Sequence, residues 1–392
     1  MKTCPTCGES FEDAGAAFCP QDATVLLNDT YGGRVDRRVG TVIAGYTLAE
    51  VIADGGMGRV YKAFDAESRE PRAIKVLHQK VGLDPVSVER FRREYESSVE
   101  LDHPYLVSAF DFGPTSDGSH YLLMEFLDGE PLSEYLAREG QMPLGRVLRY
   151  AAQLSVALGH THAAGLVHRD LKPENIFLRE TSAGIDVCLL DFGSAKNQME
   201  MGERLTAIGT TLGSPAYMSP EQASGERDID QRTDIFALGA ILHEMLSAEV
   251  AFGGSSMADI LNRVVRVDYR PLQNVESSVS AAIATAMRLR KEERPQTAEA
   301  YIERVMQASG VDVSIKELAE LSVQEVDLVL ASRVMPLMTA PTEYPPVESQ
   351  PEAASENPVD LGVPIVPQQT RNWGVWAIVG IGVVAGLIYA LI

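Results

Sequence analysis

Four polar side chains close together in the sequence could transfer a phosphoryl group. Residues 168–175 read His-Arg-Asp-Leu-Lys-Pro-Glu-Asn, which places the carboxylate of Asp170, the ammonium of Lys172 and the amide of Asn175 on one short segment. A further carboxylate, Asp191, opens an Asp-Phe-Gly triplet. Phosphoryl transfer needs a base for the attacking hydroxyl, a cation beside the phosphoryl group and oxygen ligands for a metal ion. The four side chains supply these parts.

A glycine-rich segment indicates where phosphates could bind. Residues 52–60 read Ile-Ala-Asp-Gly-Gly-Met-Gly-Arg-Val. Without a Cβ atom, Gly55 and Gly58 allow backbone amides to approach phosphate oxygens closely. Ala53 stands where the first glycine of such a loop is expected, which weakens the motif.

A lysine inside an apolar strand needs a partner of opposite charge. Lys75 lies in the run Ala-Ile-Lys-Val-Leu, and a charge buried there is costly unless it is paired. We expect Glu94, on a following helix, to be that partner. The alternative is that Lys75 extends to the surface and Glu94 is an ordinary helix charge.

In this order, the motifs resemble those of eukaryotic-like (Hanks-type) bacterial serine/threonine protein kinases, over residues 46–306. The segment Asp-Leu-Lys-Pro-Glu-Asn resembles the corresponding segment of serine/threonine kinases and not that of tyrosine kinases. The resemblance implies an α+β fold with a β-rich N-lobe and a helical C-lobe. It implies that ATP, with Mg²⁺, donates its γ-phosphate to hydroxyls of protein substrates, with Asp170 as base, Lys172 at the γ-phosphoryl group and Asn175 and Asp191 holding the metal. The implied nucleotide-binding residues are Ile52, Gly55, Gly58, Val60, Ala73, Lys75, Glu94, Met124, Glu125, Leu127 and Phe177.

The same resemblance marks residues 191–221 as an activation segment. A Ser-Pro-Glu triplet ends it where the family usually has Ala-Pro-Glu, and Glu221 is expected to pair with Arg294. Asp234 is expected to hold the backbone of residues 168–175, which we call the catalytic segment. Activity is expected to depend on autophosphorylation of this segment, at Thr210 or Thr211. Further candidate acceptors are Thr206 and Ser214.

Two other classes of protein share parts of this pattern. A membrane-bound pseudokinase scaffold would bind ATP without transferring phosphate, and Ala53 is the feature that supports it. In small-molecule kinases, histidine and glycine usually follow the base, and neither follows Asp170 directly here.

The N-terminal cysteines resemble a zinc ribbon. Cys4 and Cys7 form one Cys-x-x-Cys knuckle, and Cys19 opens a second in which Asp22 replaces the fourth cysteine. Three thiolates and a carboxylate can bind Zn²⁺, and a module of this size has too little core to fold without help. The alternative is a degenerate ribbon that binds no metal. Cys188 is expected to be a buried strand residue.

The C-terminal residues 373–392 carry no charge and predict a transmembrane helix. As a helix, about 20 residues span about 30 Å, the thickness of a bilayer core. A buried C-terminal helix is the alternative. The span is expected to be a tail anchor in the cell membrane with the catalytic domain in the cytoplasm. Its Gly-x-x-x-Gly at Gly382 and Gly386 could form the seam of a homodimer.

The elements that must position these residues follow from hydrophobic patterning. Alternation over 46–81 predicts strands, residues 86–101 predict a helix, and residues 121–126 predict a buried strand. Helical spacing begins at Leu144. The sequence begins without the pattern of a signal peptide.

The net charge of −21 argues against general nucleic-acid binding, which favours a basic surface. The domain organisation follows from composition and the resemblance. It comprises a zinc-ribbon-like module 1–30, a linker 31–45, a kinase domain 46–306, a helical extension 307–340, a Pro/Glu-rich disordered tether 341–372 and the transmembrane helix 373–392.

Overall fold

The structure is a computed structural model that describes residues 1–182, 184–191, 215–273 and 275–332. The strands are β1 Lys2–Thr3, β2 Ser10–Phe11, β3 Thr30–Tyr31, β4 Arg34–Val35, β5 Val42–Ile43, β6 Tyr46–Asp54, β7 Gly58–Asp65, β8 Pro71–Leu77, β9 Ala109–Pro114, β10 His120–Glu125, β11 Gly129–Pro131, β12 Ile176–Thr181 and β13 Gly184–Leu189. The α-helices are α1 Gln79–Gly82, α2 Pro85–Glu100, α3 Leu132–Glu139, α4 Leu144–Ala163, α6 Pro220–Ala223, α7 Arg232–Ser247, α8 Met257–Arg266, α9 Ser277–Ala284, α10 Ala298–Ala308, α11 Ile315–Glu320 and α12 Val323–Ser332. Short 3₁₀ turns are η1 Pro173–Asn175, η2 Pro215–Tyr217 and η3 Lys291–Glu293.

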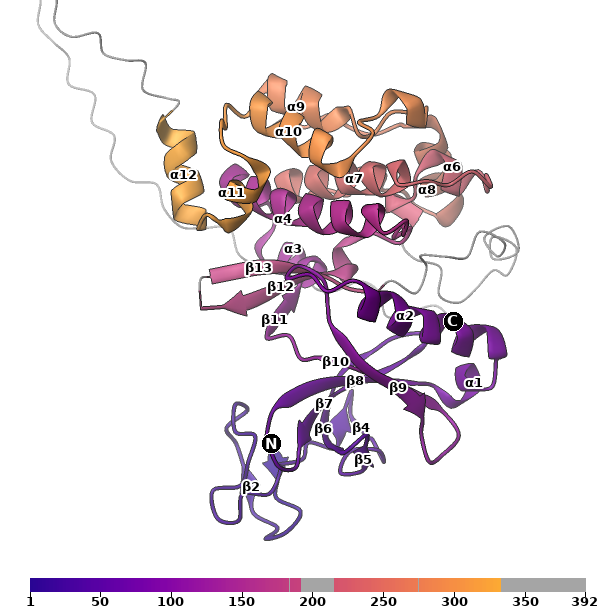
Figure 1. The fold of residues 1–392 in the computed structure, drawn as a ribbon, viewed down its shortest axis with the longest axis vertical. Coiled ribbons are helices and arrows are strands. Elements are labelled where there is room, and N and C mark those ends of the chain that lie inside the picture. The colour runs from indigo at the N-terminus through magenta and orange to yellow at the C-terminus, as the bar shows by residue number, and fades with distance from the viewer. Residues whose placement is uncertain (183, 192–214, 274, 333–392) are drawn as a thin grey trace, which may run out of the picture. The chain divides into compact units, whose positions relative to one another are not determined.

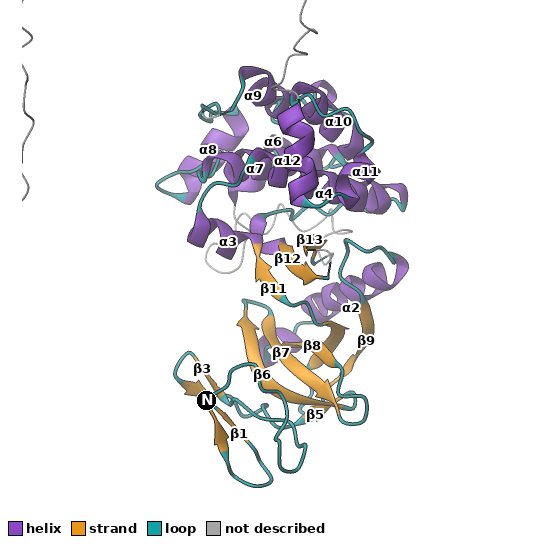
Figure 2. Cartoon of the chain, turned by 90° about the vertical axis from the view of Figure 1, so that its left-hand side faces the viewer, coloured by secondary structure: helices purple, strands orange, loops and turns teal. Residues whose placement is uncertain are grey.

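The chain forms the predicted strand-rich lobe followed by a helical lobe (Figures 1 and 2). The N-lobe contains an antiparallel six-stranded sheet in the order β5-β6-β7-β8-β10-β9. Helix α2 packs on one face of it. A second sheet, β11-β12-β13, lies between the six-stranded sheet and the helices of the C-lobe. The predicted strands and the predicted helix over 86–101 are confirmed as β6–β8, β10 and α2.

The two faces of the six-stranded sheet carry different side chains. Because side chains alternate along a strand, the pair Val60 and Lys75 lies on one face, which we call the inner face. The pair Tyr61 and Ile74 lies on the other, the outer face. An apolar cluster on the outer face contains Leu48, Tyr61, Ala63, Ile74, Val76 and Leu123. This cluster requires a cover, since so large an apolar surface is unfavourable in water.

The segment predicted as a linker, residues 31–45, provides part of that cover. Its strand β5 pairs with β6, and Val39 and Ile43 pack against the outer-face cluster. Asp36 is buried and accepts a hydrogen bond of 3.0 Å from the hydroxyl of Tyr61. The segment is therefore packed on the sheet as well as connecting two parts of the chain.

The cysteine-bearing module also packs on the N-lobe. The amide of Asn28 donates to the carbonyl of Ala49 at 2.9 Å, and the rings of Phe18 and Phe64 meet edge to face with centroids 5.1 Å apart. Lys2 pairs with Glu50 at 3.0 Å. These contacts join residues near the N-terminus to β6 and β7.

Helices α4 and α7 form the centre of the C-lobe. The residues that carry the helical spacing in the sequence (Val147, Ala151, Leu154 and Leu158) are all buried on α4. Almost every side chain of α7 is buried. Because α7 is apolar around most of its circumference, it lies inside the lobe, with neighbours on several sides.

Helices α11 and α12 pack against α4 beyond the predicted end of the kinase domain. Gln153 of α4 donates to the carbonyl of Ala319 at 2.9 Å and to Asp186 of β13 at 2.8 Å. The buried Arg149 also donates to the carbonyl of Leu321 and to Asp186. Side chains of α4 thus join the end of α11 to the second sheet.

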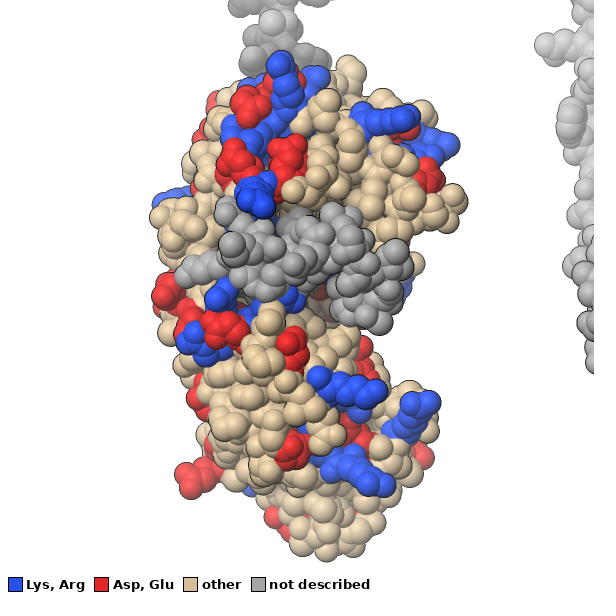
Figure 3. Space-filling view, turned by 90° about the vertical axis from the view of Figure 1, so that its right-hand side faces the viewer, with Lys and Arg blue, Asp and Glu red and all other residues tan. Residues whose placement is uncertain are grey.

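Within the described ranges, no helix is both long and apolar enough to cross a membrane. The predicted tether 341–372 and the predicted transmembrane helix 373–392 lie outside the described residues. On the face in Figure 3, Lys and Arg side chains are mixed with Asp and Glu on both lobes.

Candidate active site

The predicted pairing of Lys75 with Glu94 is confirmed. Lys75 points inward from β8, and its Nζ atom lies 2.8 and 3.0 Å from the two carboxylate oxygens of Glu94 on α2. Helix α2 begins at Pro85, where Asp84 caps it by accepting from two backbone amides. Phe91 and Glu94 are three residues apart and therefore lie on one face of the helix, which turns both toward the sheet.

A second carboxylate approaches the same ammonium from the C-lobe. The Asp191 carboxylate lies 3.7 Å from Lys75 Nζ, immediately beyond β13. Burial and the charge of Asp191 raise the pKa of Glu94 to about 7, against the opposing effect of Lys75. Burial acts to lower the pKa of Lys75, but the two carboxylates outweigh it and raise that pKa. One cation between two carboxylates leaves an excess of negative charge, which suits a site for a divalent metal ion.

The segment 170–175 brings three predicted residues into contact. Lys172 Nζ donates to Asp170 Oδ2 at 2.8 Å. Asn175 Nδ2 donates to the Asp170 backbone carbonyl at 2.8 Å and to its Oδ2 at 3.3 Å. These bonds fix the Asp170 carboxylate and orient the Asn175 amide, whose oxygen is the hard ligand that Mg²⁺ prefers.

Asp234 holds the backbone of this catalytic segment, as predicted. Its carboxylate is buried at the start of α7 and accepts from the amide of His168 at 2.9 Å and the amide of Arg169 at 2.8 Å. His162 Nε2 donates to it at 2.8 Å. Burial acts to raise the pKa of Asp234, but these donors outweigh it and lower that pKa. The charged carboxylate therefore persists inside the lobe.

The backbone at the site is held in a conformation that few L-residues adopt. Arg169 has a φ of 66° and Asp191 a φ of 58°, both in the left-handed region. Such a residue costs on the order of 1–3 kcal/mol and persists only where its surroundings impose it. His168 helps to impose it, because its Nε2 donates to the carbonyl of Leu190, next to Asp191, at 2.9 Å.

The predicted pair of Glu221 and Arg294 is a buried, two-point ion pair. Both N–O distances are 2.7 Å, and the Arg294 side chain is fully buried. The neighbouring Gln222 donates to the carbonyl of Arg169 at 2.8 Å. The end of the activation segment is thereby joined to the catalytic segment. Ser219 and Gln222 form a capping box, a pattern that predicts only the start of a helix. Nothing in that pattern predicts that the Gln222 amide also reaches the carbonyl of Arg169.

Several of the predicted nucleotide-binding residues (Val60, Ala73, Lys75 and Met124) lie on the inner face of the six-stranded sheet, and Phe177 lies on the second sheet. Val60 lies on β7, Ala73 and Lys75 on β8, and Met124 and Glu125 at the end of β10, followed by Leu127. Phe177 is on β12, while Ile52 is on β6 and 42% exposed.

The two predicted glycines differ in what requires them. Gly55 lies in the turn between β6 and β7, where its amide donates to the Gly58 carbonyl. At Gly58 a Cβ atom would lie 2.4 Å from the Val76 carbonyl oxygen, so the close approach of β7 and β8 itself requires glycine. The candidate phosphoacceptors Thr206, Thr210, Thr211 and Ser214 lie outside the described residues.

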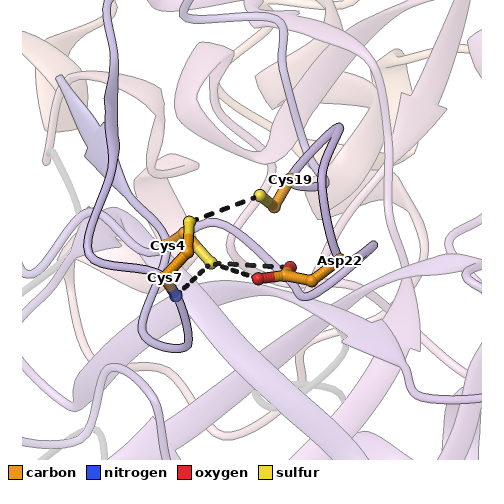
Figure 4. A group of neighbouring side chains, drawn as sticks. All are labelled: Cys4, Cys7, Cys19 and Asp22. Atoms are coloured by element: carbon orange, nitrogen blue, oxygen red, sulfur yellow. Dashed lines mark hydrogen bonds between the residues drawn. The ribbon is translucent and has the colours of Figure 1, made fainter.

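The N-terminal cysteines and Asp22 come together at one point. The donor atoms of Cys4, Cys7, Cys19 and Asp22 all lie within 4.8 Å of one another, and the side chains of two loops point toward each other (Figure 4). The sulfur atoms of Cys7 and Cys19 are 3.8 Å apart, and Cys4 Sγ lies 3.4 and 3.6 Å from the Asp22 oxygens. The predicted Cys188 is buried on β13, apart from this group.

Comparison with known proteins gives a family and several relatives. Residues 46–306 match the family described as Protein kinase domain. The chain is 35% identical over 276 residues to serine/threonine-protein kinase pkn3 of Myxococcus xanthus, covering 68% of this chain and 50% of that kinase. It is 34% identical over 260 residues to serine/threonine-protein kinase PknB of Mycobacterium tuberculosis, covering 64% of this chain and 41% of that kinase. The chain thus spans half or less of the length of these curated relatives.

A solved structure shares the fold. The crystal structure of a point mutant of the Mycobacterium tuberculosis PknI kinase domain aligns with a TM-score of 0.54 at 24% identity, covering 69% of this chain and 98% of that domain.

Replacing Glu221 with glutamine is expected to destabilise the protein strongly. The substitution leaves the fully buried Arg294 guanidinium without its counter-charge, which costs about 3–5 kcal/mol. The matched control is Glu293→Gln, which removes an exposed pair with Arg290 and should change the free energy of unfolding by at most about 0.5 kcal/mol. Urea unfolding at pH 7 measures both, and equal effects would contradict the structural role of the buried pair.

The ion pair of Glu221 and Arg294 also predicts that the stability of the protein depends on pH. Burial acts to raise the pKa of Glu221, but Arg294 outweighs it and holds that pKa below its ordinary value of 4.5. Its contribution to stability is therefore present above pH 4.5 and is lost as the pH falls toward the lowered pKa. In Glu221→Gln this part of the acid destabilisation should be absent.

Proposed function

The chain belongs to the protein kinase family, and we propose that it is a serine/threonine protein kinase that transfers the γ-phosphate of ATP to hydroxyls of protein substrates. The observation that carries the proposal is the convergence of Lys75, Glu94 and Asp191 at one point, with Asp170 and Asn175 held together on the neighbouring segment. The names of the relatives and the segment from Asp170 to Asn175 support serine and threonine as acceptors.

Asp170 acts as the base in the proposed reaction. The oxygen of the substrate hydroxyl forms a bond to the γ-phosphorus, the bond from that phosphorus to the bridging oxygen breaks, and ADP leaves. Asp170 orients the hydroxyl and accepts its proton. Lys172 lies 2.8 Å from Asp170, where its charge can stabilise both the carboxylate and the transferring phosphoryl group.

Lys75 binds the phosphates of the nucleotide, and Glu94 holds its ammonium in place. Asn175 and Asp191 provide the amide and carboxylate oxygens that would hold Mg²⁺, which neutralises phosphate charge when it is bound. Val60, Ala73 and Phe177 form the apolar slot for adenine, with Met124 beside it. Glu125 and Leu127 offer backbone groups to its edge, while Ile52, Gly55 and Gly58 border the phosphates.

Replacing Asp170 with asparagine should lower the rate of phosphate transfer by roughly 10²–10⁴-fold, because a general base is lost. Mass spectrometry of the purified protein with Mg-ATP, beside the Asp170→Asn variant, measures this. In the wild type we expect phosphate within residues 192–214, on Thr210 or Thr211. ATP affinity serves as the control and should be unchanged in the variant.

Two outcomes would contradict the proposal. If the wild type binds ATP but transfers no phosphate to itself or to any peptide, the protein is a pseudokinase scaffold. If Asp170→Asn transfers phosphate at the wild-type rate, Asp170 is not the base.

We propose further that Cys4, Cys7, Cys19 and Asp22 bind Zn²⁺. With Zn–S bonds of about 2.3 Å, two sulfurs of a tetrahedral site lie about 3.8 Å apart, which the separation of Cys7 and Cys19 fits. The Cys7 amide donates to Cys4 Sγ at 3.4 Å, which favours the thiolate that a metal requires. The bound ion would hold together a module that has little core of its own.

Elemental analysis of the reduced protein should find about one zinc ion per chain. Cys19→Ser should lose most of it, because three ligands form an incomplete structural site. Cys188→Ser is the matched control and should retain the metal, since this thiol lies on β13. A wild-type protein without zinc after expression in zinc-supplemented medium would contradict this site.

Residues 373–392 are proposed to anchor the chain in the membrane, with the catalytic domain in the cytoplasm where ATP is found. Pairing along Gly382 and Gly386 would give a homodimer in which one kinase phosphorylates the other. The full chain should then remain in the membrane fraction after alkaline extraction, and a chain ending at residue 372 should be released. The shortened chain should also autophosphorylate more slowly on dilution. Release of the full chain would contradict anchoring, and equal rates at high dilution would contradict dimerisation.

A further inference from the structure

A row of charged side chains joins the N-terminal segment to the glycine-rich turn. Arg59, at the start of β7, contacts two carboxylates at once. One guanidinium nitrogen bonds Asp54, which immediately precedes Gly55 at the end of β6, and the other bonds Asp36 from the segment that covers the sheet. This row, Asp36–Arg59–Asp54, lies beside the nucleotide site and has no part in the chemistry described above.

The row lies on the outer face of the sheet, away from the site of phosphate transfer. Arg59 pairs with Val76 across β7 and β8 and is two residues from Tyr61, and both neighbours belong to the outer-face cluster. Asp54 pairs with Arg59 across β6 and β7 and therefore shares this face. The inner face, which carries Val60 and Lys75, is the one proposed to meet the nucleotide.

We infer that Asp36 is a positioning residue for ATP binding, which acts through Arg59 and Asp54 on the glycine-rich turn. The inference rests on the proposed function, because it takes the turn at Gly55 to be the binding site for phosphate. In the part of the chain that the structure describes, none of the hydrogen-bond partners of Asp36 is a proposed nucleotide-binding residue. These partners are Asp29, Arg38, Arg59 and Tyr61.

Asp36 is held firmly enough to act in this way. Its side chain is 5% exposed, against 30% for Arg59 and 27% for Asp54. It accepts from the Tyr61 hydroxyl at 3.0 Å and from the Arg38 amide at 2.8 Å, and its own amide donates to the Asp29 carbonyl at 2.6 Å. A buried carboxylate with several fixed donors is a rigid anchor for the half-buried side chain of Arg59.

The position of Asp54 explains why anchoring Arg59 would affect the binding of ATP. A carboxylate one residue from Gly55 would repel a triphosphate if it turned toward the inner face. Arg59 holds it on the outer face, and His78 Nε2 contacts both Asp54 at 3.2 Å and the Gly55 carbonyl at 2.9 Å. A turn that is already ordered also loses less conformational freedom when the nucleotide binds.

The test compares Asp36→Asn with the wild type in the full chain. Asparagine keeps the shape of the side chain but removes the charge that fixes Arg59. The dissociation constant of Mg-ATP should rise by about three- to tenfold, measured by calorimetry. In phosphate-transfer assays KM for ATP should rise by a similar factor, with kcat changed by less than about twofold.

A matched control and a double-mutant cycle distinguish an effect of Asp36 on ATP binding from a general loss of stability. Asp117→Asn removes the 2.5 Å pair with Arg38, which ties down the same segment without touching Arg59, and should leave ATP affinity unchanged. Arg59→Gln should weaken ATP binding about as much as Asp36→Asn does. In the Arg59→Gln background, Asp36→Asn should have no further effect, because the route of its influence is gone.

Three results would overturn the inference. These are unchanged or tighter ATP binding in Asp36→Asn, an equal loss in Asp117→Asn, and an Asp36→Asn effect that persists in full without Arg59. A wild type that binds ATP without transferring phosphate would contradict the proposed kinase activity and leave this test intact, because calorimetry measures binding alone.

Discussion

The ion pair between Lys75 and Glu94 is the contact on which the site depends, because it joins the sheet of the N-lobe to α2 at the edge of the proposed nucleotide site. Both side chains are largely buried, at 16% and 10% exposed. A buried pair of charges recovers little more than its desolvation cost, and an apolar pair could hold α2 equally well. Its value therefore lies in placing an ammonium, already desolvated and directed, where we propose that phosphate binds. Asp191, 3.7 Å from that ammonium, extends the group into the C-lobe.

The rest of the fold holds these side chains in their relative positions. In the C-lobe, the buried Asp234 carboxylate fixes the catalytic segment, and the pair of Glu221 and Arg294 fixes the end of the activation segment. In the N-lobe, the sheet carries the proposed nucleotide site on its inner face and an apolar cluster on its outer face. Residues before the kinase domain cover that outer face, so the N-terminal module, the covering segment and the sheet form one packed unit.

The sequence predicts the contacts of residues whose polar groups are costly to bury. Lys75 lies in an apolar strand and therefore needs a partner of opposite charge, which is Glu94. The polar residues of the Asp-Leu-Lys-Pro-Glu-Asn segment likewise need partners, and they bond one another. The sequence does not predict contacts of residues that no motif distinguishes and that are buried only by the packing of distant elements. Asp36 lies in a segment whose glycines and charges predict a linker, and nothing local shows that it is buried against Tyr61. Arg149 and Gln153 likewise gave no sign that they would bind α11, since these contacts depend on how distant elements pack.

The proposal that these side chains bind one nucleotide and its metal ion can be tested by a structure determined with Mg²⁺ and a non-hydrolysable ATP analogue. We expect the phosphates to lie between the turn at Gly55 and Lys75 Nζ, with the metal held by Asn175 and Asp191 and the γ-phosphate facing Asp170. A nucleotide bound elsewhere, or a metal ligated by neither Asn175 nor Asp191, would contradict it.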